Sequence, residues 1–177
     1  MDGKAMTFFS DRDGMKNDAS WGGQADAYAM FFTQEGFDKF KLSKEEFDLK
    51  KEDEDKAKEE KKDEAKKDKS KKEDKDKPVD PLKFELDGIE DRKVRLTIHS
   101  SDLADAMLSK DGEKLFYLAK FEKGFDLWQT EIRTKDTKIL VKLGAENVGG
   151  IIMDKEGKNL FILADGGISK VEIEGGK

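Results

Sequence analysis

The sequence predicts an all-β protein, a partial β-propeller of about two and a half to three four-stranded antiparallel blades with a charged helical or disordered insertion. Three observations support this fold class: a repeat of 40–45 residues, short strand-like runs divided by turns, and one block of charge. The length of 177 residues suits one domain or a piece of a larger one.

Two segments in the C-terminal half repeat each other. Residues 110–116 align with residues 155–161 at an offset of 45 residues, and residues 131–132 align with residues 172–173 at an offset of 41. A period of this length, made of short strands, is typical of propeller blades.

Strand-like runs surround the turns of this repeat. Gly112 and Gly157 each follow an acidic residue, at places where a hairpin needs a positive φ. The continuous apolar run 115–118 is typical of a strand covered on both faces. One full blade and three strands of the next are predicted, with strands near 104–108, 114–120, 126–132, 138–143, 148–153, 159–164 and 168–173.

The N-terminal part reads as a third blade that is interrupted. Residues 6–10 and 26–32 have strand character and are divided by a turn at 11–14. Strand character resumes at 82–86 and 93–98, so the charged block is expected to be inserted within a blade.

The insertion is almost entirely charged, since 29 of the 34 residues from 44 to 77 are acidic or basic. Ser43 and Glu46 form a capping box that predicts a helix start, and Pro78 and Pro81 predict a stop. The run has almost no net charge, which argues against a nucleic-acid-binding arm. A solvated helix fraying into disorder is expected, serving as a surface insertion or linker or, alternatively, binding a specific partner.

These features divide the chain into five parts. The first part of an interrupted blade, the charged insertion, the remainder of that blade, a full blade and an incomplete blade are expected at 1–42, 43–80, 81–100, 101–145 and 146–177.

Three motifs resemble a known family. Residues 10–14, followed by 26–28, resemble the S-x-R-D-G…D-[ILA]-[YW] signature of WD-like propeller repeats in TolB-type proteins and tricorn-type serine proteases. Residues 84–96 resemble the tricorn-type pattern D-L-D-G-I-E-D-R-x-V-R-L. Residues 109–115 resemble the S-P-D-G-K-x-L that follows it, with Lys110 in place of the usual proline.

The resemblance implies a non-catalytic propeller fragment of a tricorn-like serine protease, which channels peptides or serves assembly. Its implied partners are the rest of the propeller, a protease domain and peptides or unfolded polypeptide, and the parent protein would be the enzyme. No catalytic residue carries over, because no position matches the catalytic motifs. The alternative is a stand-alone TolB-like module that binds a protein partner. Related bacterial proteins often look exported, although a cysteine-free chain also suits the cytoplasm.

Few residues suggest chemistry. The chain has no cysteine and one histidine, His99, so thiolate or histidine metal sites and a complete hydrolytic triad are not expected. We read His99, next to Ser100, as a turn or packing residue. The acidic residues around Gly14 lack the spacing of a calcium loop. No metal, cofactor, nucleic acid or membrane span is expected.

Three residues are candidates for peptide contact. Trp21 lies in a glycine-rich loop, where an aromatic side chain at a propeller mouth could touch a peptide. Arg92 and Arg95 could bind a peptide carboxylate bidentately, or form a salt bridge to a neighbouring blade. Open blade edges, which leave strands unpaired, are expected to promote association.

Overall fold

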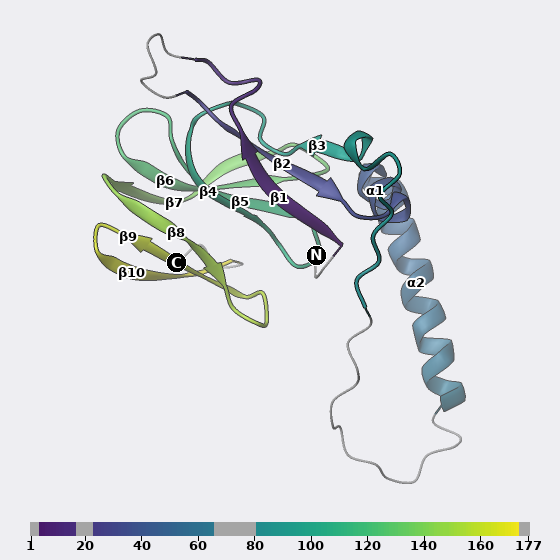
Figure 1. The fold of residues 1–177 in the computed structure, drawn as a ribbon. Coiled ribbons are helices and arrows are strands. Elements are labelled where there is room, and N and C mark those ends of the chain that lie inside the picture. Colours follow the sequence, from purple (N-terminus) through teal and green to yellow (C-terminus); the bar gives the residue numbers. More distant parts are fainter. Residues whose placement is uncertain (1–3, 17–22, 66–80, 174–177) are drawn as a thin grey trace.

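The computed structural model describes residues 4–16, 23–65 and 81–173. This part of the chain is mostly β, with ten strands in three antiparallel sheets and two α-helices. Figure 1 shows the sheets side by side, with the helices beside the N-terminal one. The described sheets do not close into a ring; they are arranged as a stack of three sheets.

Each sheet is a meander of consecutive strands. The N-terminal sheet has the order β1-β2-β3, the middle sheet β4-β5-β6-β7 and the C-terminal sheet β8-β9-β10. Their strands are β1 (Ala5–Ser10), β2 (Asp26–Phe31), β3 (Lys93–Arg95), β4 (Asp102–Leu108), β5 (Lys114–Lys120), β6 (Phe125–Glu131), β7 (Thr137–Ala145), β8 (Val148–Met153), β9 (Asn159–Ala164) and β10 (Gly167–Glu172).

Strand β5 of the middle sheet is buried on both faces. Leu115 and Tyr117 of β5 pack in a cluster shared with the N-terminal sheet, where they meet Ala29 and Phe31. Their neighbours Phe116 and Leu118 point into a second cluster shared with the C-terminal sheet. Alternate side chains of one strand therefore face two different cores, which is why this stretch is continuously apolar.

The turns of the repeat have the predicted chemistry. Gly112 and Gly157 have φ values of 78° and 77° in the hairpins that enter β5 and β9. A side chain at either position would be strained, because residues other than glycine rarely adopt this conformation.

Two helices lie around the start of the charged insertion: α1 (Gln34–Lys41) precedes it and α2 (Lys44–Ala65) forms its first part. The predicted capping box is confirmed: the Ser43 amide donates to the Glu46 carboxylate at 2.9 Å, and the Glu46 amide donates to the Ser43 hydroxyl at 3.3 Å. Residues 66–80, where fraying and the proline stop were expected, lie outside the described residues.

The structure differs from the sequence expectation on both sides of this insertion. Helix α1 was not anticipated; it forms because Phe37 and Phe40 pack on Phe31, whose ring lies 4.7 Å from that of Phe40. The strand expected at 82–86 is absent, and the later strand is limited to β3 (Lys93–Arg95). The segment 82–86 is held instead by the Glu85 amide, which donates to the Phe32 carbonyl at 2.8 Å, and by the buried Arg92.

Candidate protein-interaction surfaces

Arg92 is an internal support of the segment that precedes β3. Its side chain is buried, and its guanidinium donates to the backbone carbonyls of Phe31 at 3.2 Å, Asp87 at 2.9 Å and Glu85. These three bonds fasten residues 85–92 to the end of β2. The structure thus places this sequence candidate inside the molecule.

Arg95 lies half-exposed at the end of β3 and belongs to a network around Asp26. It donates to the Asp26 carboxylate at 2.8 Å and to the Ser100 hydroxyl at 3.0 Å. Thr97 and Ser100 also donate to Asp26, at 2.7 and 2.8 Å. The salt bridge expected to reach a neighbouring blade therefore stays within the N-terminal sheet.

The other candidates do not assemble into a site in the described part of the chain. Trp21 lies outside it. His99 is exposed on the loop between β3 and β4, and the neighbouring Ser100 hydroxyl is bonded to Asp26. The described residues contain no cluster of His, Asp and Glu that could hold a metal ion. Neither of their helices combines the length and apolar composition that a membrane span needs.

Strands β4 and β5 of the middle sheet correspond residue by residue to β8 and β9 of the C-terminal sheet. The pairing of β4 with β5 shifts at a bulge between Leu103 and Asp105, and that of β8 with β9 shifts between Val148 and Gly150. Both bulges fall at the same place in the 45-residue repeat. A bulge is a specific feature of a strand, so the match extends the sequence repeat to backbone geometry.

The N-terminal sheet matches the middle sheet through an aromatic pair. Phe8 stacks on its cross-strand partner Tyr28 at 5.5 Å, and Tyr117 stacks on its partner Trp128 at 6.5 Å. An aspartate stands two residues before Tyr28 and two residues before Trp128, and each accepts hydrogen bonds from residues beyond its own strand. Asp26 accepts them from Thr97 and Ser100. Asp126 accepts them from the amides of Leu143 and Gly144. Strands β1 and β2 therefore correspond to β5 and β6.

This correspondence identifies an apolar surface on the outer side of the C-terminal sheet. The side chains of Ile152, Phe161, Leu163 and Ile168 are 70%, 37%, 47% and 76% exposed. Their counterparts in the middle sheet, by pairing register, are Met107, Phe116, Leu118 and Leu127. The last three of these are fully buried and all four contact the C-terminal sheet's core. We call the four exposed residues the C-terminal open face.

The N-terminal sheet also has an apolar outer face, which corresponds to the other side of the middle sheet. It carries Met6, Phe8, Tyr28 and Met30, of which Met6 is 45% exposed. Their counterparts include Leu115, Tyr117 and Trp128, which the middle sheet packs against the N-terminal sheet. We call these four residues the N-terminal open face.

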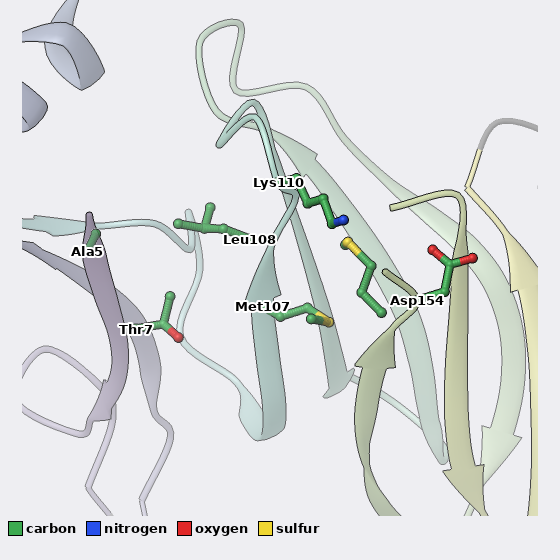
Figure 2. A pocket seen from close by; sticks show the side chains of 7 residues that line it. Ala5, Thr7, Met107, Leu108, Lys110 and Asp154 are labelled. Atoms are coloured by element: carbon green, nitrogen blue, oxygen red, sulfur yellow. The ribbon is translucent and has the colours of Figure 1, made fainter. Parts of the chain in front are cut away.

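A hollow of about 330 Å³ lies between β1, β4 and β8. Figure 2 shows Ala5 and Thr7 on one side of it and Met107 and Lys110 opposite, with Asp154 beyond. Five of its seven lining residues belong to strands. Lys110 and Asp154 are the two charged residues among them, and they do not form a set of converging acids, bases and nucleophiles.

The chain matches no family model, no curated protein and no solved structure. Its resemblance to tricorn-type propellers consequently rests on the sequence motifs.

Sequence reasoning identified the repeat but missed the open faces. The signal was present, because the repeat aligns the buried Phe116 and Leu118 with Phe161 and Leu163. The alignment does not show whether each repeated side chain is buried or exposed, because this depends on which sheet lies at the end of the described stack.

Proposed function

We propose that this chain is a non-catalytic propeller segment that binds other sheets of its own kind through the two open faces. The motifs of residues 10–14 and 84–96 favour a tricorn-like serine protease as the parent protein, with assembly or peptide access as the role. In this proposal the chemistry belongs to another part of that protein.

One observation carries the proposal: residues that are buried between sheets within the stack are exposed at its end. Phe116 and Leu118 are fully buried, whereas their counterparts Phe161 and Leu163 are not. Full burial of such a side chain contributes about 1.5–3 kcal/mol relative to exposure. Contiguous exposed apolar side chains of this kind mark interaction surfaces.

The two open faces are of complementary types. Within the stack, sheet faces that correspond to the C-terminal open face pack on faces that correspond to the N-terminal open face. Phe116 and Leu118 of the middle sheet, for example, pack against Leu160 and Ile162 of the C-terminal sheet. A further blade of the parent protein would satisfy either face, and so would a second copy of the chain. A stand-alone module of the TolB-like kind would instead use the same surface for an unrelated protein.

Association of the isolated chain tests the proposal. We expect the average mass in sedimentation velocity to rise with protein concentration. The double variant Ile152→Thr/Ile168→Thr should need an at least tenfold higher concentration to reach the same average mass. Threonine keeps the branched Cβ that strands favour while removing apolar surface.

A matched control is Ile139→Thr, which changes an isoleucine 43% exposed on β7 of the middle sheet. This variant should associate as the parent chain does. A strictly monomeric chain at high concentration, or equal effects of the two variants, would contradict a role for the C-terminal open face.

A further inference from the structure

Strand β1 has an open edge whose backbone groups are available for pairing. The Phe32 amide donates to the Lys4 carbonyl, and the Phe31 amide donates to the Arg92 carbonyl on the β3 side. In an antiparallel pair such groups alternate along the strand. The amides and carbonyls of Ala5, Thr7 and Phe9 therefore point away from β2, toward an edge that no strand of the described residues occupies.

The corresponding edge is occupied in both other sheets. Strand β1 corresponds to β5, which pairs with β4 on that side, and β9 pairs with β8 in the same way. Both partners run antiparallel and carry the bulge described above. Their positions show what kind of segment the β1 edge accommodates: an extended strand of about six residues.

The hollow of about 330 Å³ provides the space for that segment. It borders β1 through Ala5 and Thr7, and it reaches the apolar side chains of Met107, Leu108 and Met153. Strands β1, β4 and β8 are all terminal strands of their sheets, and all three contribute residues to the lining of this hollow. Because residues of β4 and β8 also line the hollow beside β1, the space at this edge suits a single extended peptide.

We propose that the β1 edge binds an extended peptide segment of a partner polypeptide, which adds to the sheet antiparallel to β1. Main-chain hydrogen bonds to Ala5, Thr7 and Phe9 supply the affinity, and alternate apolar side chains of the peptide pack against the hollow. The inference rests on the pairing register of β1 and is independent of the function proposed for the open faces.

The probe is a labelled nine-residue peptide with the sequence of residues 101–109, which contains β4. In the intact protein the Ser109 amide donates to the Lys114 carbonyl, so the amide of Met107 also faces β5 and that of Leu108 faces away. We expect saturable binding by fluorescence anisotropy. N-methylation at the Met107 position should weaken it at least tenfold, and N-methylation at the Leu108 position should change it less than twofold.

Variants of the chain complete the test. Thr7→Pro removes one amide from the open edge, a position where strands tolerate proline, and should also weaken binding at least tenfold. Ile152→Thr/Ile168→Thr should leave peptide binding unchanged, which separates this site from the C-terminal open face. Absence of binding, equal effects of the two methylated peptides, or a dimer of the chain that Thr7→Pro abolishes while the peptide fails to bind would each overturn the proposal.

Discussion

Asp154 holds the turn between β8 and β9 with its ionised carboxylate. The Asn159 side chain and then backbone amides, including that of Lys158 at 2.9 Å, donate to it and lower its pKa from 3.8 to about 2. A depressed pKa means that the ionised group stabilises the fold fully above pH 4, and that this contribution is lost as the pH falls through 2.

The stability difference between the parent chain and Asp154→Asn should therefore shrink as the pH falls from 5 toward 2. Urea unfolding at several pH values measures it. Glu156→Gln, which removes an exposed carboxylate from the same turn, controls for the loss of a negative charge. A difference that stays constant with pH would show that the Asp154 charge does not hold the turn.

Arg92 provides the clearest stability prediction for a single side chain. Arg92→Met leaves three backbone carbonyls without their donor, and we expect a loss of about 2–3 kcal/mol in the free energy of unfolding. Arg92→Lys should recover only part of the loss, because one ammonium cannot reproduce the fork of a guanidinium. Arg12→Met, at an exposed position, should stay within about 0.5 kcal/mol in the same urea titration.

At the scale of elements, Arg133 fastens helices α1 and α2 to the middle sheet. It forms an ion pair with Glu113 at 2.9 Å, donates to the Phe40 carbonyl at 3.2 Å, and lies 3.8 Å from the centre of the Phe47 ring. The contacts thus reach the end of α1 and the first turn of α2. Figure 1 shows α2 extending away from the sheets beyond this point.

A double-mutant cycle measures this attachment. Arg133→Met and Phe47→Ala should each destabilise the chain, and their effects should couple by about 1 kcal/mol because the stacked pair is lost in either variant. Leu49 lies on the same helix with its side chain 64% exposed. Leu49→Ala should add to Arg133→Met within about 0.5 kcal/mol. Additivity in both cycles would show that Phe47 does not anchor α2 through Arg133.

The elements that sequence predicted correctly are those whose own residues determine them. The apolar run 115–118, the hairpin glycines and the capping box at Ser43 carry local signals for strand, turn and helix. Helix α1 has only eight residues and includes Gly36, so its stability depends on packing against Phe31. The strand expected at 82–86 is absent for a similar reason, since Arg92, which lies outside this segment, binds the carbonyls of Glu85 and Asp87 in and next to it.

The candidate site shows the same limit. Residue type alone indicates Trp21, Arg92 and Arg95 as contact candidates, but Arg92 is buried and Trp21 lies outside the described residues. The open faces, by contrast, consist of ordinary strand residues. Their exposure is a property of the order of sheets in the stack, which no single stretch of sequence encodes.

At the scale of the whole molecule, the two open faces make the proposed association directional. A face of the C-terminal type is expected to pack on a face of the N-terminal type, so contact between copies would be head-to-tail, and such contacts form rings or open chains. This differs from a two-fold interface, in which one patch meets itself and a single substitution damages both halves of the contact.

Mixing two defective variants distinguishes these arrangements. Ile152→Thr/Ile168→Thr lacks a competent C-terminal open face, and Met6→Thr/Met30→Thr changes a cross-strand pair on the N-terminal open face. Each variant alone should remain largely monomeric. An equimolar mixture should form a heterodimer and no larger species, because each copy retains the one face that the other copy needs. Sedimentation velocity with one variant labelled measures this, and a mixture that stays monomeric would exclude head-to-tail packing of these faces.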